Sequence, residues 1–258
     1  MRIVVTVKYV PDINTDRGFE DCRVRRTPDE GTLNELDENA IEAALQLVEA
    51  AGEGEVVALT VAPPDGDPAL RKAFQLGVDR GVRVSDDILA GADYFATAAA
   101  LAAAVRKLES EGPVDLVITG MAALDGLGSV VPTLLATELG RPALTLAKKL
   151  GVSDGVLSVT REHDDVTEEL SAPLPAVLSV TDTANQPRLP NFKRIMAARG
   201  KQVEAWTASD LGLDAAPAAR TRTLSAGPRP ERPEAELVTD KGEGGKALAQ
   251  YLIKNDLV

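Results

Sequence analysis

The sequence predicts an α/β protein with an open, mostly parallel sheet and helices on both faces. Strand-like β-branched runs alternate with helix-like stretches through the first two thirds of the 258 residues. Repeated β-α-β units of this kind imply parallel strands joined by right-handed crossovers. Hydrophobic residues make up 44% of the chain and charged residues 26%, which is typical of globular domains. The length allows one or two domains.

The expected elements follow one another in a regular order. Ile3 to Val7 is a short β-branched run, typical of a strand covered on both faces. The next helix carries apolar residues at 3.6-residue spacing from Leu36 to Val48, with Asn34 as its expected N-cap and Asp37 three residues on. The pattern then predicts a strand over 55–61, a helix from 67 to a stop at 77, a strand over 81–84, a helix over 93–108 and a strand over 114–119.

Another helix and further strands are expected in the next part of the chain. Residues 129–139 have a helical pattern, and 144–150, 156–160 and 176–180 have strand patterns. No helix separates the last two strands, so we expect them to form an antiparallel hairpin added to the sheet.

The C-terminal part differs in composition. From about Lys201 the apolar periodicity fades, and Ala215 to Pro233 is rich in Ala, Pro, Arg and Ser, as in an extended arm. Ala247 to Leu257 regains apolar residues at helical spacing. We therefore expect an α/β domain over 1–200 and an arm with a terminal helix over 201–258. Such a helix needs a surface, on this domain or on a second protein.

Charge and rare residues exclude several classes of function. The chain has 28 basic and 40 acidic residues, a net charge of −12, which disfavours nucleic acid as a partner. With one His and one Cys, it cannot form an internal disulfide or a Cys/His zinc cluster, and we expect no metal site. Any catalytic triad would depend on His163, which lies in a charged run typical of a turn, so no catalytic residue is assigned. Aromatic residues are only 3%, too few to hold a flavin ring or stacked bases without help.

Membrane insertion is not expected. The longest apolar stretch, around Ala96 to Val105, is shorter than the roughly 18 residues of a span. The N-terminal residues lack the pattern of a signal peptide, and a cytoplasmic location is the expectation.

A ligand site is expected where the strands end. Ligands of open parallel sheets bind beyond the carboxyl ends of the strands. Of the three segments there, Thr6 to Val10, Val61 to Asp65 and Gly120 to Val131, the last has Gly126 and Gly128 before a helix, so backbone N–H groups can approach an anion. The third glycine of a dinucleotide fingerprint is absent. A plain Gly-rich turn, with Asp125 or Ser129 as the helix cap, stays open as the alternative.

A docking loop is expected over 183–199. Pro187 and Pro190 stiffen this segment, and Leu189, Phe192 and Met196 make it partly apolar. It is basic in an otherwise acidic protein, which favours contact with a partner. A surface loop whose apolar residues pin it to the core is the alternative.

At these residues the sequence resembles the β subunits of electron transfer flavoproteins, over nearly the whole chain. The motifs that carry the resemblance, in order, are Val7 to Asp12, Leu33 to Ala44, Asp125-Gly126, Leu174 to Val177, and Asn185 to Arg188 with Ile195 to Arg199. The tail from Val238 to Gly245 is similar to that of bacterial members.

The resemblance implies a heterodimer with a larger α subunit that holds most of the redox-active FAD. The β subunit of this family buries an AMP in a domain of the adenine nucleotide alpha hydrolase-like fold. Family members are electron carriers rather than enzymes with bond-making chemistry. They collect electrons from acyl-CoA dehydrogenases, as in fatty acid β-oxidation, and pass them to a membrane quinone oxidoreductase.

The resemblance also implies positions for the sites. It puts the AMP site in the 1–200 domain, at Thr6, Asn34, Glu35, Leu36, Asp37, Val61, Gly120, Leu124, Asp125, Gly126, Leu127, Gly128, Ser129, Val130 and Val131. Contacts to the FAD lie near Ile13 and Leu36. The partner-docking positions are Asn185, Pro187, Arg188, Leu189, Pro190, Phe192, Ile195 and Met196, with Phe192 as the apolar anchor. Glu168 matches an acidic position that meets the flavin-bearing domain, and 201–258 would pack on the partner subunit.

Some residues depart from the family pattern. Gly128 to Val131 replaces residues that are often polar, and Ile13 and Leu36 stand where aromatic residues are common. A second FAD in the AMP site, as in relatives that bifurcate electrons from NADH, is therefore an alternative. A stand-alone ATP- or AMP-binding regulatory protein resembling universal stress proteins is the other.

Overall fold

A computed structural model describes residues 1–27, 29–232, 234–235, 237, 239 and 241–258. The chain divides into two compact units, Met1–Ala226 and Gly227–Val258. Val238 and Asp240 of the expected tail motif, and Pro233 at the end of the expected arm, lie outside the described residues.

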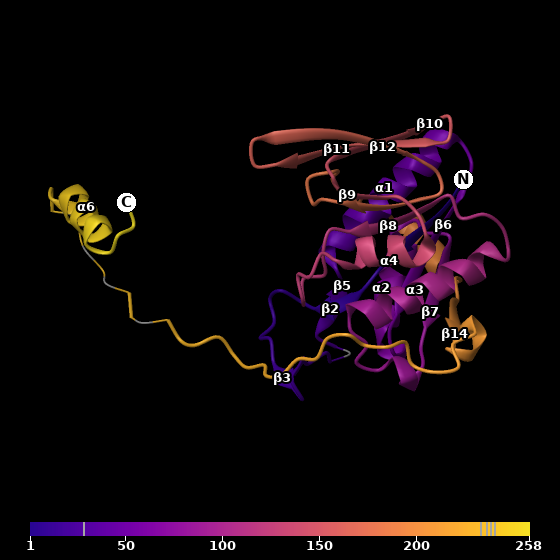
Figure 1. Cartoon of the computed structure of the whole chain (residues 1–258), viewed down its shortest axis with the longest axis horizontal. Helices are drawn as coiled ribbons and strands as arrows, with labels where there is room; N and C mark the ends of the chain where they lie inside the picture. Colours follow the sequence, from indigo (N-terminus) through magenta and orange to yellow (C-terminus); the bar gives the residue numbers. More distant parts are fainter. Residues whose placement is uncertain (28, 233, 236, 238, 240) are drawn as a thin grey trace. The chain divides into compact units, whose positions relative to one another are not determined.

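The first unit is built on a seven-stranded parallel sheet (Figure 1), which confirms the expected fold class. Its central β-branched strands are buried on both faces because helices cover both. In the register, Ile3 pairs with Val56 on one side and with Leu116 on the other. The strand order is β14 (Val203–Trp206), β7 (Arg80–Val84), β6 (Glu55–Val61), β1 (Arg2–Thr6), β8 (Leu116–Gly120), β13 (Ala176–Val180) and β9 (Ala143–Ala147).

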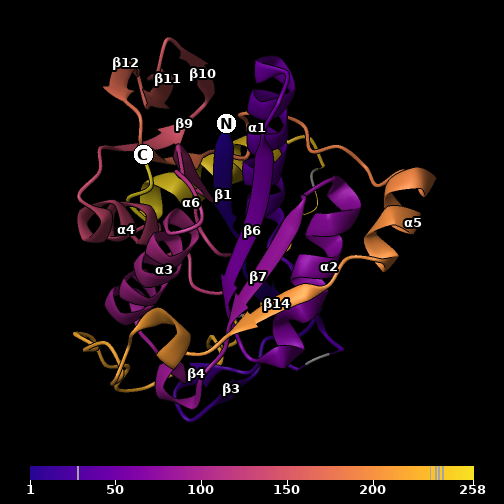
Figure 2. The same ribbon diagram turned by 90° about the vertical axis from the view of Figure 1, so that its right-hand side faces the viewer.

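Helices cover the two faces in pairs (Figure 2). Side chains of α1 (Glu35–Ala51) and α2 (Asp67–Leu76) pack with Ile3 and Val5, whereas side chains of α3 (Tyr94–Glu109) and α4 (Val131–Leu139) pack with Val4 of the same strand. Asp93 caps α3 by accepting from the N–H of Ala96 at 2.9 Å. The helices are α1 (Glu35–Ala51), α2 (Asp67–Leu76), α3 (Tyr94–Glu109), α4 (Val131–Leu139) and α5 (Phe192–Arg199), with short 3₁₀ turns η1 (Pro64–Gly66), η2 (Asp87–Leu89) and η3 (Ser209–Leu211).

The antiparallel addition is present, but its expected pairing is wrong. The three-stranded sheet β10 (Lys149–Ser153), β11 (Val156–His163) and β12 (Val166–Pro173) pairs β11 with β10 and β12. β13 instead enters the main sheet, parallel to β8 and β9. The sequence did not reveal β12 because its residues are exposed or half-buried and form no apolar run. His163 ends β11, and the following Asp164 adopts a left-handed turn with φ 48°.

Two small hairpin-like pairs precede the first helix. β2 (Tyr9–Pro11) pairs with β5 (Gly31–Leu33), and β3 (Phe19–Glu20) pairs with β4 (Arg23–Val24). Both β2 and β5 contact α2.

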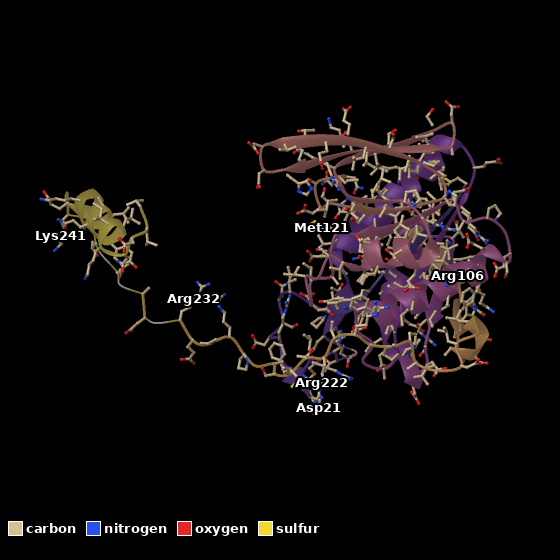
Figure 3. All side chains as sticks on the ribbon, in the orientation of Figure 1. Asp21, Arg106, Met121, Arg222, Arg232 and Lys241 are labelled. Carbon is tan, nitrogen blue, oxygen red and sulfur yellow. The ribbon has the colours of Figure 1, made fainter. Side chains whose placement is uncertain are left out.

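The first unit continues past residue 200, where we expected a boundary. β14 adds to β7 at the edge of the sheet, and Trp206 is buried there with the Lys107 ammonium 5.1 Å from its ring. The segment that follows lies along the β3–β4 hairpin, since the thiol of Cys22 contacts the carbonyl oxygen of Leu224 at 3.7 Å (Figure 3 labels the adjacent Asp21 and Arg222). Short strands of this kind give little apolar periodicity, which is why the boundary is misplaced.

The second unit contains α6 (Gly244–Lys254), which starts three residues before the expected helix. None of its residues is buried, and Leu248, Tyr251 and Ile253 are exposed. Among the residues that the structure describes, no helix has the length and apolar character of a membrane span.

Candidate functional site

The sheet reverses its order at β1. The chain passes from β1 to β6 and β7 on one side, then crosses to β8 on the other. In open α/β sheets, ligands bind outside the carboxyl ends of the strands at this reversal. Lys8 follows β1 there, and the loop that starts with Met121 follows β8 (Figure 3). The start of α1 meets both.

Asn34 ties the start of α1 to the loop after β8. The residue is fully buried at the N-cap position, but its side chain makes no capping bond to its own helix. Its Nδ2 donates to the carbonyl oxygen of Ala122 at 2.9 Å, and its Oδ1 accepts from the N–H of Leu124 at 3.0 Å. The expected N-cap therefore satisfies the loop backbone instead.

Asp37 is a buried carboxyl group at the same junction. Its Oδ2 accepts from the N–H of Lys8 at 2.8 Å. Burial raises the pKa of Asp37 to about 7, although hydrogen bonds from Asn34, Lys8 and Gly120 and the Lys8 charge favour the ionised form. This carboxyl group therefore titrates near neutral pH.

Asp125 is the charged centre of the loop. Its carboxylate accepts from Lys8 Nζ at 2.8 Å and from the Arg26 guanidinium. Burial would raise the pKa of Asp125, but the charges and hydrogen bonds of Lys8 and Arg26 hold it below its usual value. Sequence reasoning missed both cations. The signal that could have found Arg26 is its place in a basic run on an acidic chain.

The second half of the loop offers free backbone donors. Across the described residues, the N–H groups of Gly128, Ser129 and Val130 donate no hydrogen bond. Leu127 and Ser129 have left-handed backbones, with φ of 48° and 53°, and α4 has no side-chain cap. The alternative in which Asp125 or Ser129 caps this helix is therefore wrong. Free amides at a helix start can hold an anion such as phosphate.

Further expected cofactor positions lie at the ends of two strands, in the first turn of α1 and in the loop after β2. Thr6 ends β1, and Val61 ends β6 on the far side of β1 from β8. Glu35 is exposed and Leu36 half-buried in the first turn of α1. Ile13 lies in the loop after β2 and is 53% exposed. The structure thus brings Asn34 and Gly120 against Asp37, and Lys8 links Asp37 to Asp125, while Ile13 lies in a separate, exposed loop.

Residues 185–199 of the expected docking loop 183–199, called the docking segment from here on, are held by polar contacts. The Arg188 guanidinium pairs with Glu42 and Glu49, and Asn191 caps α5. Leu189 and Phe192 are 85% and 79% exposed. Leu189, Phe192 and Met196 therefore do not pin the segment to the core, although Ile195 is half-buried. Arg188 is paired within the chain, and its expected contact with a partner stays a prediction.

Glu168 lies on the three-stranded antiparallel sheet rather than on the main parallel sheet. It is part of β12 and forms an ion pair with Arg161 of β11, whose hydrogen bond lowers the pKa of Glu168. Within the described residues, Glu168 makes no hydrogen bond or ion pair to Asp125, Lys8 or Arg26.

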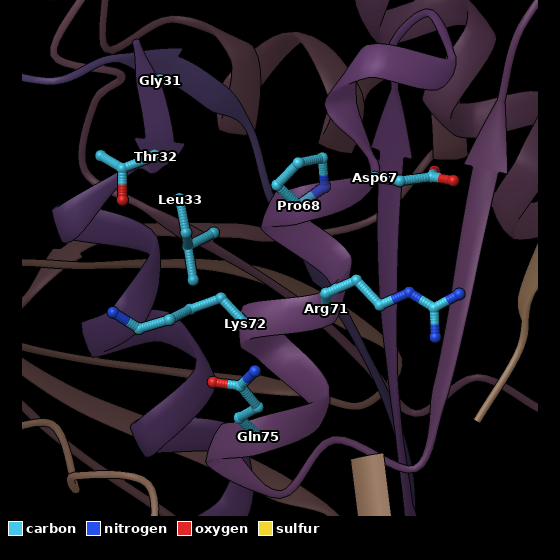
Figure 4. Close-up of a pocket in the computed structure, with 8 residues that line it drawn as sticks. All are labelled: Gly31, Thr32, Leu33, Asp67, Pro68, Arg71, Lys72 and Gln75. Atoms are coloured by element: carbon cyan, nitrogen blue, oxygen red, sulfur yellow. The ribbon is translucent and has the colours of Figure 1, made fainter. Parts of the chain in front are cut away.

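A cavity of about 450 Å³ lies outside the site (Figure 4). Leu33 of β5 and α2 residues line it, and its Lys72 ammonium pairs with Glu38 at 3.2 Å. None of the expected nucleotide-site residues contributes to its wall. Among the described residues, no group of three or more His, Cys, Asp or Glu side chains could hold a metal ion.

The fold defines a doubly wound α/β protein, with a candidate ligand site beyond the ends of β1 and β8. The family model for the electron transfer flavoprotein domain matches residues 22–211. The chain is 37% identical over 266 residues to the electron transfer flavoprotein subunits beta of Mycobacterium bovis (strain ATCC BAA-935 / AF2122/97) and Mycobacterium tuberculosis (strain ATCC 25618 / H37Rv), with 99% of each chain covered. It is 36% identical to that of Mycobacterium leprae (strain TN), with the same coverage. The chain belongs to the electron transfer flavoprotein family, which confirms the resemblance.

Proposed function

We propose that the chain is the β subunit of a heterodimeric electron transfer flavoprotein. The observation that carries the proposal is the similarity to β subunits along 99% of both chains. As such a subunit, the chain is an electron carrier component. It binds AMP, covers an FAD held mainly by a larger α subunit, and acts in the cytoplasm.

The loop after β8 supports the AMP assignment. The free N–H groups of Gly128, Ser129 and Val130 suit a phosphate, as does the uncapped start of α4. Lys8 and Arg26 are 45% and 42% exposed at their side chains, so both lie near water beside Asp125. The residues present therefore fit a phosphorylated ligand.

FAD supplies the redox chemistry of such a complex by accepting and releasing electrons. The chain offers little to stack on its ring, because Ile13 and Leu36 are aliphatic and aromatic residues are only 3%. These two side chains can cover the cofactor and exclude water without holding it, so the ring must be held mainly by the α subunit.

The docking segment supports contact with electron donors. Leu189 and Phe192 are exposed on a basic surface of an acidic chain. We assign acyl-CoA dehydrogenases to this surface, with a quinone oxidoreductase as the acceptor of the electrons. The second unit, residues 227–258 with the unburied α6, packs on the α subunit in this proposal.

The nucleotide content of the complex tests the proposal. The chain is co-expressed with its α subunit, the purified complex is denatured, and the released nucleotides are identified by mass. One FAD and one AMP per heterodimer are expected. Two FAD would favour the class that bifurcates electrons from NADH, and a complex without nucleotide would refute the proposal.

Size-exclusion chromatography of the chain expressed alone tests the second alternative. A stable homodimer that binds ATP would favour a stand-alone regulatory protein. A chain that aggregates alone and becomes soluble with the α subunit would support the flavoprotein.

A further inference from the structure

The two ends of the docking segment are held by different helices. Its start lies along α1, and α5 at its end contacts α2. Between the two, Pro187 and Pro190 restrict the backbone, and the apolar side chains face solvent. Since exposed side chains gain no rigidity from packing, their position depends on the backbone that carries them.

Asn39 holds the start of the segment. The residue is 5% exposed, and its Nδ2 donates to the carbonyl oxygens of Asp182 at 3.2 Å and Asn185 at 3.0 Å. Asn185 Nδ2 donates in return to the carbonyl oxygen of Asn39 at 2.9 Å. This reciprocal pair joins residues that are 146 positions apart.

Glu42 holds the middle of the segment, one helical turn further along α1. Its carboxylate accepts from Arg188 Nε at 2.6 Å, from an Arg188 terminal nitrogen at 3.1 Å and from the Arg188 backbone N–H at 3.2 Å. Gln46 donates to the same carboxylate at 2.8 Å, so Glu42 is fixed as well. The Glu42 side chain is 7% exposed and that of Arg188 is 18% exposed, so water competes little for this pair.

Glu49 completes the arrangement from the surface. Its carboxylate accepts from the two terminal nitrogens of Arg188 at 2.6 and 3.0 Å, and its side chain is 56% exposed. The guanidinium is thus held between two carboxylates of one helix. Its planar shape allows it to meet both at once.

We infer that Asn39 and Glu42 are positioning residues that fix the docking segment in its partner-binding geometry. They do not touch the partner themselves. A segment that is ordered before binding loses less conformational entropy on docking. The inference rests on the proposed docking function and adds the residues that prepare it.

The test uses the complete heterodimer with Glu42→Gln, which keeps the shape of the side chain and removes its charge. The apparent KM of an acyl-CoA dehydrogenase for the complex should rise about tenfold, equal to about 1.4 kcal/mol. The kcat, the flavin absorbance and the reduction of the flavin by dithionite should not change. Amide hydrogen exchange, followed by mass spectrometry, should become faster in residues 185–191.

Glu38→Gln is the matched control. Glu38 lies on the same helix and pairs with Lys72 of α2 rather than with the docking segment. The control should leave the KM and the exchange of 185–191 as in the wild type. If Glu42→Gln does not fold, Glu49→Gln removes the exposed carboxylate alone and should give a smaller change in the same direction.

Non-additivity separates positioning from general destabilisation. In a Phe192→Ala background, Glu42→Gln or Asn39→Ala should raise the KM little further, because the side chain that they position is gone. A fully additive rise would contradict the inference.

The outcomes distinguish the inference from the proposed function. If Phe192→Ala raises the KM while Glu42→Gln leaves it unchanged, the positioning role is refuted and docking stands. If exchange in 185–191 increases in Glu42→Gln but neither variant changes the KM, the assignment of docking to this segment is refuted, and the partner-binding role of Asn39 and Glu42 with it.

Discussion

Gly120 and Asp37 meet so closely that a β-carbon on Gly120 would lie 2.6 Å from Asp37 Oδ1. The same atom would lie 2.6 Å from the backbone oxygen of Leu36. The contact brings the end of β8 against the first turn of α1, and Lys8 after β1 completes the junction through its N–H. A small residue at the end of β8 is therefore a condition for assembling the candidate nucleotide site.

Gly120→Ala should distort this junction. The added methyl group must displace the helix backbone or the carboxylate, and such overpacking costs about 1–3 kcal/mol. We expect a lower Tm of the heterodimer and less bound nucleotide after purification. Gly151→Ala on β10, where nothing lies within 4 Å of the added carbon, is the matched control and should change neither quantity. An unchanged Tm in Gly120→Ala would show that the junction can relax.

The stability of the complex should depend on the protonation of Asp37. The pKa of this group is about 7 in the folded chain and 3.8 in its ordinary state, so folding favours the protonated form. The protonated Asp37 therefore contributes fully to the free energy of unfolding below about pH 4, and this contribution is lost as the pH rises to about 7.

Asp37→Asn should remove this pH dependence. Between pH 5 and pH 8 the free energy of unfolding of the wild type should fall by at least about 1 kcal/mol relative to that of the variant, since one pKa unit corresponds to about 1.4 kcal/mol. The Tm at the two pH values measures this change. Asp154→Asn, on the exposed turn after β10, should retain the wild-type dependence. Parallel pH curves for Asp37→Asn and the wild type would contradict the prediction.

Asn34→Ala should loosen the loop after β8. It leaves the carbonyl oxygen of Ala122 and the N–H of Leu124 without their buried partner, at a cost of about 1–3 kcal/mol. We expect reduced AMP content and a lower Tm. The exposed Asn14, whose amide contacts Asp12, gives the control Asn14→Ala, for which both measurements should match the wild type.

Phe192→Ala should weaken docking. The side chain is 79% exposed, so its loss costs the free subunit little stability but removes apolar area from the partner contact. The rate of electron transfer from an acyl-CoA dehydrogenase at low complex concentration should fall several-fold, with an unchanged flavin spectrum. Phe19→Ala, an exposed phenylalanine on β3, should leave that rate unaltered. Equal rates for Phe192→Ala and the wild type would contradict the docking role.

Local patterns in the chain predict much of the fold. The strand over 55–61 and the helix stop at Gly77 are placed correctly, because buried β-branched runs and glycine caps are local signals. β12 and β14 were not predicted, because a half-exposed or very short strand is stabilised mainly by its neighbour in the sheet. We wrongly expected β11 to pair with β13 because β12, its actual partner in the chain between them, was not predicted.

By itself the sequence determined the α/β class and the family, because each depends on residue types in a recognisable order, and it predicts a ligand site at the strand ends and a docking segment. Only the tertiary structure decided that Asn34 bonds the loop after β8 rather than its own helix, and that Arg188 is bound by Glu42. These contacts join positions 88 to 146 residues apart. Hydrogen-bond partners at such separations depend on how helices and loops pack, which no local pattern records.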